Sequence, residues 1–210
     1  GKLWVGTRFG LNYADPRAGK LVWKEQHVPE LEFARSMAPA ADGSLWIAAD
    51  TAGVFRLNPK SGQARRYDLA PGTGADALHI MVDRLQRVWV SSRRGLFRGT
   101  RDAGGAVRFQ QLKPAGTDAD ESFVYAVEDA AGQVWICGDN GLVRYSGDTS
   151  RRFTMADGLR SDGVAQVAPA PDGHSVWIGY REAFGLTQLT LTDGTVRVEH
   201  LSAGGTSGLR

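Results

Sequence analysis

The residues that could carry out catalysis or bind a metal are few, and their spacing matches none of the common catalytic or metal-binding patterns. The histidines are His27, His79, His174 and His200, and the single cysteine is Cys137. No His-x-His, Glu-x-x-His or Cys-x-x-Cys pair joins them, and no Gly-x-Ser-x-Gly segment occurs. Such patterns are typical of metal sites and of activated serines. We therefore expect no catalytic residue, no metal site and no cofactor.

A set of charged residues stands out by its regular position. Five of the six tryptophans recur at intervals of 42, 43, 46 and 42 residues: Trp4, Trp46, Trp89, Trp135 and Trp177. A charged residue follows each of them by four positions: Arg8, Asp50, Arg93, Asp139 and Arg181. Gathered around one opening, these side chains could bind an anionic or polyhydroxylated ligand, with Phe9 and Tyr180 as stacking surfaces. The simpler alternative is that charges at strand ends only keep those ends hydrated.

The elements that must position these residues are visible as an internal repeat. Each tryptophan lies in an apolar segment: LWVG at 3–6, LWIA at 45–48, VWVS at 88–91, VWIC at 134–137 and VWIG at 176–179. A glycine and a branched aliphatic residue follow: Gly10-Leu11, Gly53-Val54, Gly95-Leu96, Gly141-Leu142 and Gly185-Leu186. An outer segment comes next, usually Arg-aromatic: Arg66-Tyr67, Arg108-Phe109 and Arg152-Phe153, with partial matches at Val22-Trp23 and Arg197-Val198. Apolar stretches from Ser36, Leu78, Phe123 and Val164 precede the later tryptophans.

Four short strands in about 43 residues, present in about five copies, predict an all-β chain. This period is typical of a β-propeller built from four-stranded antiparallel blades; a β-helix is the main alternative. We call the four strands A, B, C and D, with the tryptophan in B and the outer Arg-aromatic pair in D. In a propeller the B–C and D–A loops share one face, where ligands usually bind. The charged set is expected there, with His79 and Tyr125 as weaker candidates.

The whole chain, residues 1–210, is expected to be a single propeller segment that is truncated at both ends. It begins just before the first B strand, and residues 207–210 resemble residues 157–160, which precede an A strand. Two interpretations stay open: five blades closed by a strand from elsewhere, or an arc of a larger ring, most plausibly of seven blades. We favour the arc, which would expose two apolar blade faces and so promote association.

Composition excludes several classes of function. The chain has 25 basic and 23 acidic residues and a formal net charge of +2, so it lacks the basic excess of a nucleic-acid-binding domain. Hydrophobic residues make up 42% of the sequence, an ordinary globular value. A single cysteine excludes an internal disulfide. No apolar run is long enough to cross a bilayer, so no membrane contact is expected of this segment.

Two stretches carry a family resemblance. DGSLWIAADTAGVFRLNPKSGQARRY at 42–67 and AAGQVWICGDNGLVRYSGDTSRRFTMADGLRSDGVAQV at 130–167 resemble two-component regulator propeller repeats. The family pattern runs Asp-x-x-Gly-x-Leu-Trp-Ile-Gly-Thr, then Gly-Leu, then Arg-Tyr, then a late Gly-Leu before a Val-rich strand. The match extends over nearly the whole chain, although only the first copy keeps the threonine, at Thr7.

The resemblance implies a non-catalytic sensor region on the periplasmic side of a bacterial signalling receptor. Such receptors continue into a histidine kinase or diguanylate cyclase module. The implied partners are an unknown small molecule or saccharide and a second copy of the chain, in a homodimer formed through propeller contacts. Two alternatives remain: an enzyme resembling streptogramin lyase, which also has Asp-Gly-x-x-Trp repeats, and a pure protein-interaction propeller. Fold alone cannot separate them.

Overall fold

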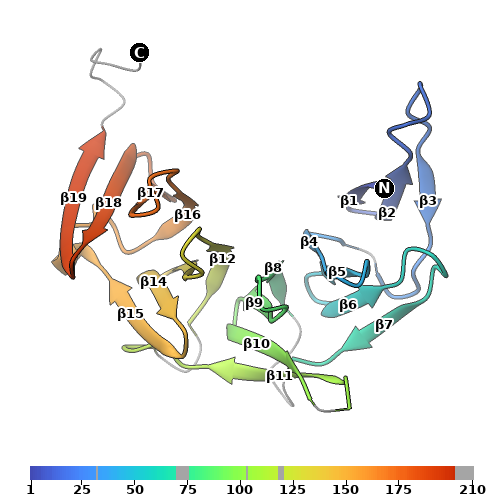
Figure 1. The fold of residues 1–210 in the computed structure, drawn as a ribbon, viewed down its shortest axis with the longest axis horizontal. Coiled ribbons are helices and arrows are strands. Elements are labelled where there is room, and N and C mark those ends of the chain that lie inside the picture. The colour runs from blue at the N-terminus through green and yellow to red at the C-terminus, as the bar shows by residue number, and fades with distance from the viewer. Residues whose placement is uncertain (32, 70–75, 103, 118–120, 202–210) are drawn as a thin grey trace. The chain divides into compact units, whose positions relative to one another are not determined.

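The structure of the chain is a computed structural model that describes residues 1–31, 33–69, 76–102, 104–117 and 121–201 (Figure 1). These residues form five antiparallel sheets and one short 3-10 helix, η1 (Met155–Asp157). The chain groups into two compact units, Gly1–Leu112 and Lys113–Arg210. The resemblance noted for residues 207–210 lies outside the described residues. No helix in the described part is long and apolar enough to cross a membrane.

The first unit contains three sheets, which we number in chain order. Sheet 1 consists of β1 (Leu3–Thr7), β2 (Gly10–Ala14) and β3 (Lys24–Gln26). Sheet 2 consists of β4 (Ser36–Pro39), β5 (Leu45–Ala48), β6 (Val54–Leu57) and β7 (Ala64–Tyr67). Sheet 3 consists of β8 (Ala77–Val82), β9 (Val88–Ser92), β10 (Gly95–Arg101) and β11 (Val107–Leu112).

The second unit contains two sheets of the same type. Sheet 4 consists of β12 (Phe123–Glu128), β13 (Val134–Gly138), β14 (Gly141–Ser146) and β15 (Thr149–Phe153). Sheet 5 consists of β16 (Val164–Pro169), β17 (Ser175–Tyr180), β18 (Leu186–Thr192) and β19 (Thr195–Leu201). In all five sheets each strand pairs with its neighbour in the sequence, which is the meander expected of a propeller blade. The number of blades in a complete ring stays a prediction.

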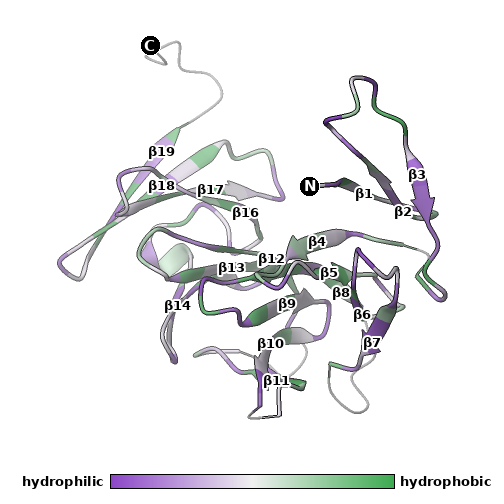
Figure 2. Cartoon of the chain, turned by 45° about the vertical axis from the view of Figure 1, so that its right-hand side comes forward, coloured by the Kyte–Doolittle hydropathy of each residue, from purple (hydrophilic) through white to green (hydrophobic). Residues whose placement is uncertain are grey.

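The predicted repeat of strands is confirmed, except for the position of the outer strand of sheet 1. The tryptophan strand is second in the four complete sheets and first in sheet 1, which has the B, C and D strands alone. In sheets 2, 3 and 4 every residue of the tryptophan strand is buried, which is the pattern of a strand whose two faces are both covered. Figure 2 shows the contrast with the outer strands β3 and β7, which are hydrophilic along most of their length.

The five repeated glycines begin the C strands for a conformational reason. Their φ angles are all positive, from 77° to 134°: Gly10, Gly53, Gly95, Gly141 and Gly185. At Gly141 a Cβ atom would also lie 2.3 Å from the carbonyl oxygen of Phe153. A residue with a side chain would therefore meet both backbone strain and a direct clash at this turn. The glycine that the sequence repeat displayed is a requirement of the turn between strands B and C.

One predicted strand was misplaced. The outer strand of sheet 1 was expected at Val22-Trp23, but β3 begins at Lys24, and these two residues are exposed in the preceding segment. In sheets 2 and 4 the aromatic residue of the outer strand packs against the tryptophan of the same sheet, as Tyr67 does with Trp46 and Phe153 with Trp135. In sheet 1 the aromatic contact is made within β1 and β2 instead, where the rings of Trp4 and Tyr13 lie 5.1 Å apart.

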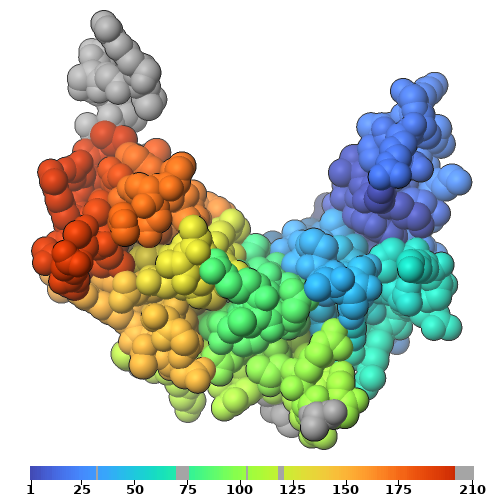
Figure 3. Space-filling view, viewed as in Figure 1, coloured from blue at the N-terminus to red at the C-terminus, as the bar shows by residue number. Residues whose placement is uncertain are grey.

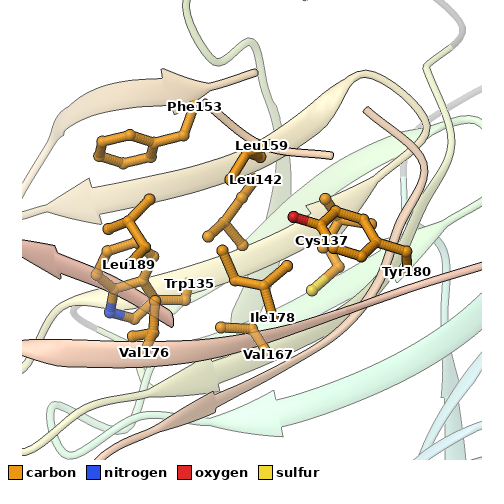
Figure 4. Packing of buried hydrophobic residues seen from close by; sticks show 11 residues of the cluster. Trp135, Cys137, Leu142, Phe153, Leu159, Val167, Val176, Ile178, Tyr180 and Leu189 are labelled. Atoms are coloured by element: carbon orange, nitrogen blue, oxygen red, sulfur yellow. The ribbon is translucent and has the colours of Figure 1, made fainter. Parts of the chain in front are cut away.

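Two hydrophobic clusters lie between successive sheets of the first unit, and one lies between the two sheets of the second. One joins sheets 1 and 2 and a second joins sheets 2 and 3; the space-filling view shows sheets 2 and 3 in continuous contact (Figure 3). The third joins sheets 4 and 5 in the second unit (Figure 4). Burial of Cys137 in this third cluster raises the pKa of its thiol, so the residue is an apolar core side chain as expected.

Candidate functional site

A cavity of about 680 Å³ opens in the first unit between the loops of sheets 1 and 2. Its wall consists of the B–C turn of sheet 1, the B–C turn of sheet 2, and the connection from β3 to β4. We call it the loop cavity. These are the two kinds of loop that the sequence predicted on one ligand-binding face. Within this unit, the expectation that B–C and D–A loops lie together is confirmed.

The connection that lines the loop cavity is fixed at its end by both neighbouring sheets. The amide of Ala34 donates to the carbonyl of Thr7 at 3.3 Å, and the amide of Arg35 donates to the carbonyl of Ala48 at 2.9 Å. A Cβ at Gly6 would lie 2.6 Å from the carbonyl oxygen of Ala34, so only glycine allows this approach. The wall of the cavity is thus held by backbone contacts.

The loop cavity has an apolar floor and a charged rim. Val28, Leu31 and Ala49 are buried at its base. The rim carries exposed side chains of both signs and two aromatic rings: Arg8, Phe9, Glu25, His27, Glu30 and Phe33. Phe9 is 87% exposed, so its ring presents a flat apolar surface to solvent at the rim. This combination suits a ligand that has one apolar face and several polar edge groups.

Two of the predicted site residues reach the loop cavity. Arg8 is exposed on the rim. Asp50 is also in the wall, but its Oδ2 atom accepts from Nε of Arg35 at 2.8 Å, which partly neutralises it. The Asp50 backbone has φ 43° and exchanges two hydrogen bonds with Ala77 of β8. Asp50 therefore also has a structural role in joining sheet 2 to sheet 3.

The third predicted charge of the first unit lies outside this wall. Arg93 is exposed in the B–C turn of sheet 3, and its amide donates to the carbonyl of Asp76. The carboxylate of Asp76 pairs with the next residue, Arg94, at 3.4 Å. Arg93 is thus available to solvent at the predicted turn, and its role in ligand binding stays a prediction.

In the second unit the two predicted charges bind each other. Arg181 of sheet 5 forms an ion pair with Asp139 of sheet 4, and both side chains are more than 40% exposed. The amide of Arg181 also donates to the carbonyl of Gly163 at 3.1 Å. Opposite charges in successive B–C loops thus link neighbouring sheets. This pairing favours the simpler interpretation for Asp139 and Arg181, in which the charges stabilise the strand ends.

Tyr180 is a correction to the predicted site. It was expected as an exposed stacking surface, but it is buried in the core of the second unit, where its ring lies beside Cys137 (Figure 4). Its hydroxyl donates to Oγ1 of Thr187 at 2.8 Å and accepts from the amide of Arg160 at 3.1 Å. Thr187 in turn bonds Nδ1 of His200 at 2.9 Å. The phenol anchors a hydrogen-bond network, which strand alternation alone could not reveal.

His79 and Tyr125, the weaker candidates, lie in the inner strands β8 and β12 and are partly buried. Burial lowers the pKa of His79 to about 4, so this imidazole is neutral at physiological pH. In β8 and β12 the register shifts by one residue just before each of them. Among the described residues, no group of three or more His, Cys, Asp or Glu side chains is placed to bind a metal.

Sequence reasoning missed the residues that the β3–β4 connection contributes. Five residues were not among the predicted ligand-binding residues: Glu25, His27, Glu30, Phe33 and Arg35. The first four line the loop cavity, and Arg35 pairs with Asp50, which also lines it. They lie in the least repetitive part of the first repeat, so no pattern that the five copies share includes them. The available signal was the number of charged and aromatic residues in this connection.

Comparison with known proteins shows a likeness in structure alone. No protein-family model matches the chain, and no curated protein matches it significantly. The extracellular domain of the hybrid two-component system BT4673 from Bacteroides thetaiotaomicron is similar, with a TM-score of 0.72 and 18% identity. The match covers 98% of this chain and 30% of that one.

Other solved structures share the fold. The extracellular domain of a second system from the same organism, BT3049, has a TM-score of 0.70 at 20% identity, covering 85% of this chain and 25% of that one. Virginiamycin B lyase from Staphylococcus aureus has a TM-score of 0.70 at 12% identity, covering 96% of this chain and 67% of that one. This chain thus spans less than a third of either extracellular domain. At such identities the likeness establishes the fold only.

Proposed function

We propose that this chain is a non-catalytic, ligand-binding part of an extracytoplasmic sensor in a bacterial signalling receptor of the two-component or cyclic-di-GMP type. The observation that carries the proposal is the loop cavity, with its apolar floor, its charged rim and the exposed ring of Phe9. The likeness to extracellular domains of two-component systems supports the sensor role. A periplasmic location and a homodimer are part of the same proposal.

The ligand class we propose is a saccharide or another small polyhydroxylated molecule. Phe9 offers a flat apolar surface to one face of a sugar ring, while Arg8, Glu25 and Glu30 can bond its hydroxyl groups. To act as a signal, the ligand must bind two arrangements of the receptor with different affinity. The loop cavity is the place where that difference would arise.

The test is saccharide binding by the loop-cavity variants Phe9→Ala and Arg8→Ala. The probes are a neutral disaccharide and a uronic-acid disaccharide, titrated by calorimetry into the 210-residue chain. Since both side chains are exposed, the variants should fold normally. Since both side chains lie on the cavity rim, each variant should bind the disaccharide about tenfold more weakly. Arg108→Ala is the matched control, because the Arg108 side chain is 84% exposed on β11, outside the cavity wall. Equal affinity in all four proteins, or no binding of either probe, contradicts the proposal.

One observation favours the alternative function, an enzyme on the same scaffold. His27, Glu25 and Glu30 line the same cavity, which places an imidazole and two carboxylates around one space. Among the described residues no ion pair joins His27 to either acid. Chemical change of a bound disaccharide, followed by mass spectrometry and abolished by His27→Gln, would favour an enzyme. A bound probe that is recovered unchanged favours the sensor.

A further inference from the structure

A second cleft, of about 310 Å³, opens between sheets 4 and 5 in the second unit. Its wall includes the A–B turns of both sheets and two arginines, and the side chains that matter here are Trp135, Arg144, Arg151 and His174. None of these residues belongs to the loop cavity of the first unit. The cleft is therefore a separate place on the molecule, which the proposed function does not use.

The two arginines of this cleft lie side by side. Arg144 of β14 and Arg151 of β15 are directly paired across the two strands. Both guanidinium carbons lie near the ring of Phe153, at 6.0 Å and 4.7 Å from its centroid, so both groups are on the same face of the sheet. Two like charges at opposed positions repel each other, and this arrangement is unfavourable without a counterion.

Arg144 has an unsatisfied donor in this position. Its Nε atom is buried and has no hydrogen-bond partner within the part of the chain that the structure describes. Burial and the charge of Arg151 lower the pKa of Arg144, against an opposing effect of Asp129. Asp129 is committed elsewhere, because Oδ2 accepts from Nε1 of Trp135 and Oδ1 accepts from the amides of Ala131 and Gln133. Among the residues that the structure describes, Arg151 forms an ion pair with Asp157 alone, at 3.4 Å.

Sheet 2 shows the same pair of arginines with its counterion in place. Arg56 and Arg65 are the corresponding cross-strand pair, with Arg56 opposite Trp46 as Arg144 is opposite Trp135. There the carboxylate of Asp42 forms an ion pair with Arg56. Asp42 stands four residues before its tryptophan, and the corresponding residue of sheet 4 is Ala131.

We propose that the cleft between sheets 4 and 5 binds an oxyanion group of an external ligand, a carboxylate, sulfate or phosphate, between Arg144 and Arg151. The oxyanion takes the place that the Asp42 carboxylate has in sheet 2. It accepts charge-assisted hydrogen bonds from the guanidinium groups of Arg144 and Arg151, which both line the cleft, and neutralises the pair. His174, exposed at the mouth of the cleft, contributes a further donor.

The test is titration of the 210-residue chain with inorganic phosphate, sulfate and acetate in chloride-free buffer. Binding is followed by the Nε–H resonances of the arginines and by the midpoint of thermal unfolding. A saturable shift of the Arg144 resonance and a rise in the midpoint are expected with at least one anion. Stronger binding of acetate identifies a carboxylate ligand, and stronger binding of phosphate or sulfate identifies a phosphorylated or sulfated one.

Three variants make the assignment specific. Ala131→Asp adds to sheet 4 the carboxylate that sheet 2 has, and Ala131 is exposed, so this variant should fold and lose at least about tenfold in anion affinity. Arg144→Gln should lose binding as well. Arg65→Gln in sheet 2 is the control and should bind as the parent does. Unchanged binding in Ala131→Asp, equal shifts at all exposed arginines, or no saturable shift with any anion overturns the proposal.

Discussion

The Arg152 side chain forms five hydrogen bonds in the second unit. Its five N–H groups reach both carboxylate oxygens of Glu121 at 2.6 and 2.8 Å, Oγ1 of Thr117 at 2.8 Å, and the carbonyls of Asn140 and Ala115 at 2.7 and 3.1 Å. The Glu121 side chain is fully buried. The Arg152 side chain thus turns inward from the outer strand β15 and joins the segment that precedes β12 to the B–C turn of sheet 4.

Replacing Arg152 is expected to be costly for stability. Arg152→Gln leaves the Glu121 carboxylate buried without its partner, which costs about 3–5 kcal/mol in the free energy of unfolding. The neighbouring Arg151→Gln is the matched control, since the Arg151 side chain is 42% exposed and should contribute about 0–1 kcal/mol. Urea unfolding monitored by tryptophan fluorescence measures both. Equal losses in the two variants would show that the Arg152 network does not act as argued.

The lowered pKa of the buried His79 determines how its contribution to the free energy of unfolding changes with pH. Its pKa is about 4 in the folded chain and 6.5 as the ordinary value, because burial disfavours the charged imidazole. Between these values the unfolded chain binds the proton and the folded chain does not, so stability is lost as the pH falls from 6.5 toward 4. His79→Gln should flatten this part of the curve, measured by urea unfolding at several pH values. A parallel curve for the variant would contradict the assignment to His79.

At the scale of elements, the A–B turns show where the repeat departs from its own rule. Gly43, Gly132 and Gly173 have φ angles of 80°, 81° and 73° in these turns. Sheet 3 has Gln86 instead, with φ 60°. The side chain of Gln86 accepts a hydrogen bond from the amide of Ala41 in the turn of sheet 2, at 2.8 Å. Gln86 thus combines a strained backbone conformation with a hydrogen bond that links sheet 3 to sheet 2.

Two substitutions of Gln86 separate these effects. Gln86→Ala removes the hydrogen bond and keeps the left-handed conformation, so it should lower the free energy of unfolding by about 1 kcal/mol. Gln86→Gly removes the hydrogen bond but also relieves strain worth about 1 kcal/mol, so it should be close to neutral. Thermal or urea unfolding of the two variants gives the comparison. If the alanine variant is as stable as the glycine variant, the positive φ at Gln86 carries no cost.

Strand prediction succeeded where the requirement is local and failed where it is not. Trp46, Trp89 and Trp135 mark their strands because each is buried at the same position of its own sheet. The prediction at Val22-Trp23 failed because Trp4 of sheet 1 packs against Tyr13 of β2, so its outer strand β3 lacks the aromatic contact that marks β7 and β15. A periodic sequence therefore predicts an element well only if every copy has the same neighbours.

At the scale of the whole molecule, large apolar side chains are exposed on the first and last sheets. Leu3 and Val5 of β1 and Leu186 and Leu201 of sheet 5 are between 38% and 49% exposed. In the inner sheets the residues that correspond to Leu3, Val5 and Leu186 are buried. Such surfaces favour contact with further protein. A larger ring of seven blades, which would cover these surfaces, stays a prediction.

The expected consequence is self-association of the 210-residue chain. Sedimentation velocity should show a mean mass that rises with concentration. The double variant Leu3→Lys, Val5→Lys should weaken this association, because it places two charges on the apolar face of β1. Leu85→Lys is the control, since Leu85 is 68% exposed in an isolated turn. A strictly monomeric parent chain, or equal association in both variants, would contradict this role of the exposed face.

The sequence by itself determined the strand repeat, the all-β class and the turns that begin each C strand. These features follow from short-range rules, namely a buried tryptophan at a fixed phase and a glycine where φ is positive. Only the tertiary structure decided which loop residues share a space. It placed Glu25 and His27 beside Arg8, buried Tyr180, and left Arg144 without the carboxylate that Arg56 has. Those outcomes depend on contacts between distant segments, which no local pattern encodes.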